Sequence, residues 1–123
     1  MITEEDFSLD ALKSKMKKPE IGAIVTFLGV VRADSGGEIK GMKIEMNEAM
    51  AEKEFEKLKR EALETFNLEA VEIVHRKGSL EVGDSIVAIL AGAKHRKEAF
   101  RACEYLIEEL RVSEAIMMKE LKN

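Results

Sequence analysis

The chain of 123 residues contains one cysteine, one proline, two histidines and no tryptophan. A single cysteine excludes an intramolecular disulfide and fits a reducing cytoplasm. Without a CxxC pair, two histidines do not build a zinc site, and we expect neither a metal nor a cofactor. No apolar run approaches the roughly 20 residues of a membrane span, and Met1–Glu5 lacks signal-peptide character, so we expect no membrane contact.

A broad basic surface is also absent, because 24 acidic residues outnumber 20 cationic ones and the net charge is −4. General nucleic-acid binding relies on such a surface, so we expect no nucleic-acid partner. The basic residues of interest occur locally instead, at Arg32, at His75–Lys77 and at Lys94–Lys97. This distribution favours a pocket for a small anion over a groove for a polymer.

Lys94–Lys97, with the sequence Lys-His-Arg-Lys, is the most informative stretch. It follows an apolar run, Ser85–Leu90, and a corner of small residues, Ala91–Ala93, and it opens an amphipathic helix. The first N–H groups of such a helix are free at the positive end of its dipole, where additional cations are disfavoured. We therefore expect an anion to compensate them. A histidine that only caps the helix start is the alternative reading of His95.

Apolar periodicity predicts seven elements in the order α-β-β-α-β-β-α. The predicted helices cover residues 8–18, 48–66 and 95–110, and the predicted strands cover residues 21–31, 39–46, 70–75 and 85–91. Residues 76–83 are expected to form a connection, and the tail, residues 110–123, is left open between a strand, an extended segment and a frayed helix. The order predicts one α+β domain over residues 1–123, with a mostly antiparallel sheet and helices packed on one face.

Two helical stripes are expected to supply much of the core. The predicted stripes are Ala51, Phe55, Leu58, Ala62 and Phe66 in the second helix, and Ala99, Phe100, Cys103, Leu106, Ile107 and Leu110 in the third. Five methionines allow two readings, a subunit interface or ordinary core filling. They are Met42, Met46, Met50, Met117 and Met118.

Four segments of the chain match motifs of a known family in order and spacing. They are Gly22–Arg32, Met50–Glu54, Val74–Asp84 and His95–Phe100. On these segments the chain resembles the large, catalytic subunits of molybdopterin synthase. The resemblance implies an α/β-hammerhead fold and a cytoplasmic sulfurtransferase of molybdenum cofactor biosynthesis.

The resemblance also implies partners and a substrate. Such subunits form a central homodimer that binds a small ubiquitin-like sulfur-carrier subunit at each end, which makes a heterotetramer. The carrier's C-terminal Gly-Gly tail bears a thiocarboxylate, and its sulfur is transferred to cyclic pyranopterin monophosphate. By position, Arg32, His95 and Arg96 match substrate-binding residues of the family, and we expect them to share one anion pocket. His75–Arg76 is expected to be mainly structural or interfacial.

The C-terminal segment departs from the family pattern of two lysines. Arg111 stands at the first lysine position, and Met118 at the second, with Lys119 next to it. Arginine stays charged and does not readily act as a nucleophile or base, whereas lysine does. The resemblance assigns catalysis to Lys119 and Arg111, with Lys119 and Glu120 also binding substrate. A solvated tail lysine is the alternative for Lys119.

A second function therefore stays open beside the sulfurtransferase. It is a non-catalytic dimeric module that binds a pterin phosphate or a ubiquitin-like C-terminal tail. A lysine amine that lies near His95 and Arg96 favours the enzyme, whereas an outward-facing tail favours the binding module.

Overall fold

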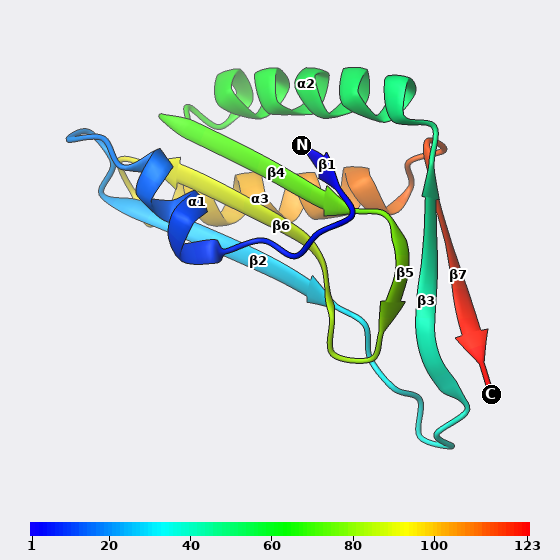
Figure 1. Ribbon diagram of the computed structural model, residues 1–123. Coiled ribbons are helices and arrows are strands. Elements are labelled where there is room, and N and C mark those ends of the chain that lie inside the picture. Colours follow the sequence, from blue (N-terminus) through cyan, green and yellow to red (C-terminus); the bar gives the residue numbers. More distant parts are fainter.

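A four-stranded sheet lies at the centre of the fold. The structure, a computed structural model, describes residues 1–123. The strands of this sheet are β1 (Ile2–Thr3), β2 (Ala23–Val30), β4 (Ala70–Arg76) and β6 (Ser85–Ala93), in the order β1-β4-β6-β2 (Figure 1). β6 pairs antiparallel with both β2 and β4, and β1 adds a parallel edge to β4.

A second, three-stranded antiparallel sheet stands at one end of the first (Figure 1). Its strands are β3 (Ile39–Met46), β5 (Gly78–Glu81) and β7 (Ile116–Lys122), in the order β5-β3-β7. The tail therefore adopts the first of its three predicted alternatives, a strand. The prediction that residues 76–83 only connect two elements is wrong, because β5 lies within them and pairs with β3.

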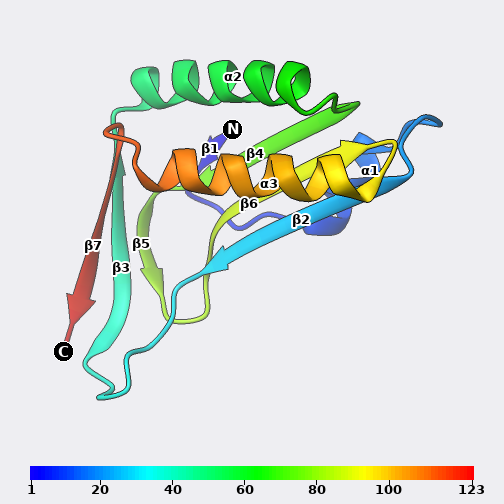
Figure 2. The same cartoon turned by 180° about the vertical axis from the view of Figure 1, so that it is seen from behind.

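Two long helices, α2 (Glu48–Thr65) and α3 (Arg96–Arg111), cover one face of the central sheet (Figure 2). The short helix α1 (Leu9–Met16) lies on the opposite face, where Leu12 and Met16 pack against apolar side chains of β4 and β6. The predicted α+β class with mostly antiparallel pairing is confirmed. The predicted placement of helices on one face holds for α2 and α3 alone. None of the three helices has the length and apolar character that a membrane crossing requires.

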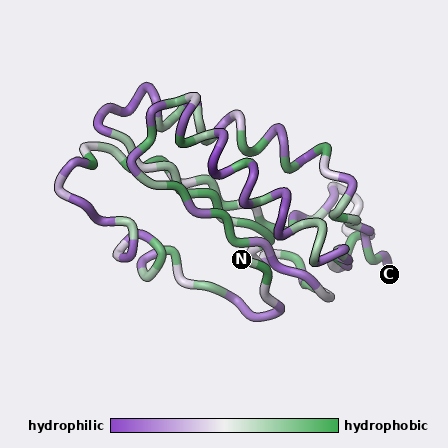
Figure 3. The backbone as a smooth tube through the Cα atoms, turned by 90° about the horizontal axis from the view of Figure 1, so that it is seen from above, coloured by the Kyte–Doolittle hydropathy of each residue, from purple (hydrophilic) through white to green (hydrophobic).

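The main core lies between the sheet and the two long helices. The strands are mostly hydrophobic, whereas the helices alternate between hydrophobic and hydrophilic stretches (Figure 3). Phe55 is 1% exposed and packs in this core with Leu106, as the helical stripes predict. The prediction for Phe100 is wrong, because this side chain is 60% exposed. It follows Ala99 by one residue, which turns it about 100° away from the buried stripe.

The methionines divide between the two readings left open by the sequence. Met42 and Met46 are half-buried and pack against the cluster around Ile44. Met50, Met117 and Met118 are exposed. Core filling therefore applies to the first two, and the other three remain available for an interface.

Substitution of Gly41 by alanine is expected to weaken the second sheet. A Cβ at Gly41 would lie 2.2 Å from the carbonyl oxygen of Leu80, a backbone atom that moves only with β5. Forced repacking of this kind costs about 1–3 kcal/mol, which urea denaturation measures as a lower free energy of unfolding. Gly36→Ala is the matched control, since its Cβ would meet only ordinary contacts. Equal stability of the two variants contradicts the prediction.

Candidate functional site

The helix start that follows β6 is uncapped, as the sequence predicts. His95 is the N-cap residue of α3, with extended backbone angles (φ −127°, ψ 150°), and its side chain makes no capping hydrogen bond. His95 therefore occupies the cap position without capping the helix through its side chain. All four side chains of Lys94–Lys97 are exposed. The free N–H groups and the basic side chains together form a site that favours an anion.

Four cations of the basic segments that the sequence indicates have no partner within the chain. They are Arg32, Lys94, Arg96 and Lys97, none of which forms an ion pair or a side-chain hydrogen bond. By contrast, Arg76 donates to the carbonyl oxygens of Ser85 and Glu4, and Lys77 pairs with Glu48. Arg76 thus has a structural role, the first of the two that the sequence left open for it, and Lys77 has a partner in the chain, while the other four are available to a ligand.

Arg32 and Lys94–Lys97 lie at opposite ends of the central sheet (Figure 2). β2 and β6 are antiparallel, and Arg32 follows the end of β2 whereas the basic stretch follows the end of β6. β2 is 8 residues long, which corresponds to roughly 25 Å. A single chain therefore does not bring Arg32 together with His95 and Arg96, contrary to the expectation of one shared pocket.

A cavity of about 240 Å³ lies beneath the C-terminal end of α3. Ten residues line it, and seven of them are hydrophobic. The other three are Gly29, His75 and Arg111. The cavity is at the Arg32 end of the sheet, because α3 runs back from its start at His95 to its end at Arg111 (Figure 2).

His75 forms the buried end of this cavity, with a side chain that is 4% exposed. Its Nδ1 lies 2.8 Å from the carbonyl oxygen of Arg76, and its ring stacks on Phe55 with centroids 6.3 Å apart. Burial holds the pKa of His75 below its usual value of 6.5, and the nearby N-terminal ammonium acts in the same direction. The imidazole is therefore neutral at neutral pH. Sequence reasoning classed this residue as structural and missed its place at the cavity.

Arg111 and the tail form the outer part of the cavity. Arg111 is the last residue of α3, with a side chain 72% exposed and Nη2 3.2 Å from a carboxylate oxygen of Glu108. Met118 of β7 lines the cavity, whereas Lys119 does not. Since successive strand residues point to opposite faces, Glu120 shares the face of Met118 and Lys119 points to the other side. There Lys119 stands opposite Lys43 of β3.

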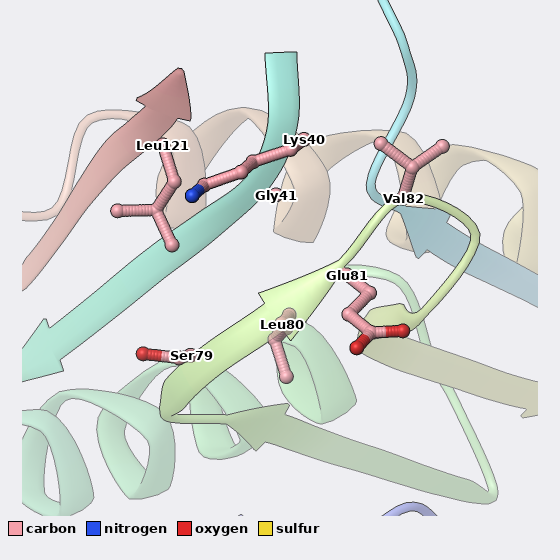
Figure 4. Close-up of a pocket in the computed structure, with 7 residues that line it drawn as sticks. All are labelled: Lys40, Gly41, Ser79, Leu80, Glu81, Val82 and Leu121. Atoms are coloured by element: carbon pink, nitrogen blue, oxygen red, sulfur yellow. The ribbon is translucent and has the colours of Figure 1, made fainter. Parts of the chain in front are cut away.

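A second hollow, of about 560 Å³, opens on the three-stranded sheet. Figure 4 shows its lining residues, with Lys40 extending toward Leu121 and the Glu81 carboxylate pointing away from both. It is larger than the cavity under α3, but none of the predicted site residues lines it. The chemistry therefore favours the smaller cavity.

Comparison with known proteins identifies the family to which the chain belongs. The model of the family described as MoaE protein matches residues 2–113. The chain belongs to the MoaE family. A member from Pyrococcus abyssi, named molybdopterin synthase catalytic subunit, is 35% identical over 118 residues, which is 95% of this chain and 80% of that protein. A protein of the same name from Thermoplasma volcanium is 33% identical over 121 residues, or 98% and 88% of the two chains.

Solved structures show the same MoaE fold. The molybdopterin synthase of Staphylococcus aureus superposes with a TM-score of 0.93 at 32% identity, covering 99% of this chain and 90% of that chain. A Helicobacter pylori complex of subunits 1 and 2 of molybdopterin-converting factor has a TM-score of 0.85 at 24% identity, with 99% and 84% covered. This second likeness concerns the fold alone.

Proposed function

We propose that this MoaE-family chain is the catalytic subunit of a cytoplasmic molybdopterin synthase. It transfers sulfur from the C-terminal thiocarboxylate of a small ubiquitin-like carrier subunit to cyclic pyranopterin monophosphate. The observation that carries the proposal is the unpaired state of Arg32 and Arg96, the two cations that the family resemblance assigns to the substrate. Both reactants are anionic, and guanidinium groups at a free helix start suit them.

We further propose that the working unit is a homodimer. Arg32 and Arg111 lie at one end of the chain and His95 and Arg96 at the other. A two-fold axis that sets the helix start of one copy against the Arg32 end of its partner completes two equivalent sites. Exposed apolar side chains are available for such a contact, among them Val30 on the free edge of the central sheet.

In each site the residues of the two copies have distinct tasks. Arg111 and Arg32 bind the anionic groups at the cavity mouth, and Arg96 with the helix N–H groups stabilises negative charge that develops at the attacked carbonyl. His95 is exposed and next to these donors, and it transfers protons in the reaction. Lys119 and Glu120 lie on the free edge of β7, where they meet the tail of the incoming carrier.

One observation favours the second candidate function, a non-catalytic dimeric module that binds a pterin phosphate or a carrier tail. Lys119 points away from the cavity, so the group that faces the cavity from the tail is the apolar Met118. The deciding experiment mixes the purified protein with a thiocarboxylated carrier and cyclic pyranopterin monophosphate and assays for molybdopterin. Product formation is expected. Normal carrier binding without product identifies the binding module instead.

Substitutions of Arg111 test its role at the cavity mouth. Arg111→Met removes a charged hydrogen-bond donor and is expected to lower kcat/KM about tenfold, because such a bond contributes about 1.5–3 kcal/mol. Arg111→Lys keeps the charge and adds an amine that can lose its proton, so turnover is expected to equal or exceed that of the unchanged protein. Steady-state kinetics with saturating carrier measures both. Unchanged kcat/KM in Arg111→Met contradicts an anion-binding role.

A further inference from the structure

The cavity under α3 has polar groups at its two ends and apolar walls between them. Arg111 is largely exposed at the mouth, and His75 is 4% exposed at the buried end. Seven of the ten lining residues are hydrophobic. A ligand that fills this cavity therefore meets a cation at the mouth and an imidazole at the far end.

The hydrogen bond of His75 determines which of its nitrogens is protonated. A backbone carbonyl only accepts hydrogen bonds, so the Nδ1 that lies 2.8 Å from the Arg76 oxygen carries the proton. In the neutral ring Nε2 then has a free lone pair. Nε2 makes no hydrogen bond within the chain. It also keeps contact with solvent, because the buried polar side-chain atoms without a partner are Nε of Arg76 and Oε2 of Glu98. It is an available acceptor in the wall of the cavity.

The surroundings of His75 hold the ring in place and keep it neutral. Phe55 of α2 stacks on it at an interplanar angle of 21°, and Val87 of β6 is its cross-strand neighbour. Neither brings a charge. The charged group that acts on the ring is the N-terminal ammonium of Met1, beside β4, which disfavours an imidazolium. Arg111 of α3 lines the same cavity, where its side chain is largely exposed.

Gly29 leaves room for a ligand in front of this acceptor. It pairs with Val87, which pairs in turn with His75, so the three form a row across the sheet. A Cβ at Gly29 would lie 3.0 Å from Cγ1 of Val87 and would narrow the cavity. The row thus presents a small residue, an aliphatic wall and a hydrogen-bond acceptor.

We propose that His75 binds the substrate, with Nε2 accepting a hydrogen bond from an N–H or O–H group of the cyclic pyranopterin. The heterocycle binds with its donor groups toward His75 and with its phosphate beside Arg111. This inference rests on the proposed function and adds to it a residue that selects for a donor-bearing ring. It differs from the exposed anion-binding residues, since it recognises the uncharged part of the substrate.

Two substitutions of His75 test this role. His75→Phe keeps a flat ring against Phe55 but removes the acceptor, and it is expected to weaken binding of cyclic pyranopterin monophosphate about 30-fold, because the substrate donor is left unpaired. His75→Gln offers an amide oxygen near the Nε2 position and is expected to stay within about fivefold of the unchanged protein. Titration calorimetry measures both, with binding of the carrier, expected to be unchanged, as the control.

The pH dependence separates a binding role from a structural one. Protonation of Nε2 removes the acceptor, so the pterin affinity of the unchanged protein is expected to fall as the pH drops through the pKa of His75, which burial holds below 6.5. His75→Gln has no proton to gain there and lacks this acid limb. If His75→Phe does not fold, the comparison of His75→Gln with the unchanged protein decides alone.

Some outcomes overturn the proposal. Pterin affinity in His75→Phe equal to that of the unchanged protein excludes the hydrogen bond, and so does an acid limb of the pterin affinity that persists unchanged in His75→Gln. If carrier binding weakens in His75→Phe while pterin binding is unchanged, His75 contributes to the carrier site and not to the pterin site, which also contradicts the proposal. Because binding is measured apart from turnover, an inactive protein that binds the pterin through His75 refutes the proposed enzyme and supports this inference.

Discussion

Dimers that combine an Arg32→Ala chain with an Arg96→Ala chain are expected to regain activity that neither variant has alone. Each single variant loses a guanidinium that binds an anion through charged hydrogen bonds. This loss costs about 3 kcal/mol of binding free energy, so kcat/KM is expected to fall about 100-fold. In the proposed dimer each site takes Arg32 from one copy and Arg96 from the other. A mixed dimer therefore has one site without either arginine and one intact site.

The size of the recovery follows from the symmetry. Random association gives mixed dimers in about half of the population, and half of their sites are intact, so about a quarter of the activity of the unchanged protein returns. Coexpression of the two variants with different affinity tags supplies the mixed dimers. The molybdopterin assay then gives the recovered fraction.

A matched control uses two residues from the same end of the chain. His95→Ala and Arg96→Ala both alter the helix start, so every site of their mixed dimer lacks one of the two groups and no recovery is expected. Purified mixed dimers of Arg32→Ala and Arg96→Ala that stay inactive contradict the shared site. Recovery in the control pair contradicts it as well.

Elements whose pattern is local were predictable from the sequence. The alternation over residues 39–46 predicts β3 with its observed bounds, Ile39–Met46. Four of the five residues of the predicted stripe of α2 are buried, whereas the fifth, Phe66, follows the end of the helix and is half-buried. These features depend on side-chain periodicity and on neighbours within one helical turn, which a sequence displays directly.

Elements that depend on distant partners were not predictable. β5 has four residues and no alternation, and it forms only because β3, far earlier in the chain, offers a pairing edge. Phe100 appears apolar and helical in the sequence, but the angle of α3 against the sheet decides that Ala99 and Cys103 are buried and Phe100 is not. Tertiary packing determines both outcomes.

For the site, the sequence predicted chemistry better than location. The types of residue at Arg32, His95 and Arg96 indicate an anion site, and the structure leaves the two arginines unpaired. Their separation follows from the antiparallel pairing of β2 with β6, which motif spacing does not reveal. His75 lines the cavity because the C-terminal end of α3 lies over it. The sequence shows only a basic triplet at the end of a strand, which does not predict this packing.

Phe55→Ala is expected to cause the largest loss of stability of any substitution considered for this chain. Phe55 is 1% exposed in the main core, and its ring also supports His75 through the stack at 6.3 Å. Truncation of a buried phenylalanine costs about 3–5 kcal/mol, through lost apolar burial and the cavity left behind. Urea denaturation measures this as a lower free energy of unfolding, at two protein concentrations because the proposed dimer would add to stability.

The same helix supplies the control for Phe55→Ala. Met50 is 43% exposed, and Met50→Ala is expected to change the free energy of unfolding by no more than about 0.5 kcal/mol. A loss below about 1 kcal/mol in Phe55→Ala would mean that the surrounding core closes over the gap. In that case the loss of the Phe55 ring beneath His75 would also leave the pterin affinity unchanged. The proposed role of a rigid His75 predicts the opposite, a loss of pterin affinity in Phe55→Ala that exceeds any change in carrier binding.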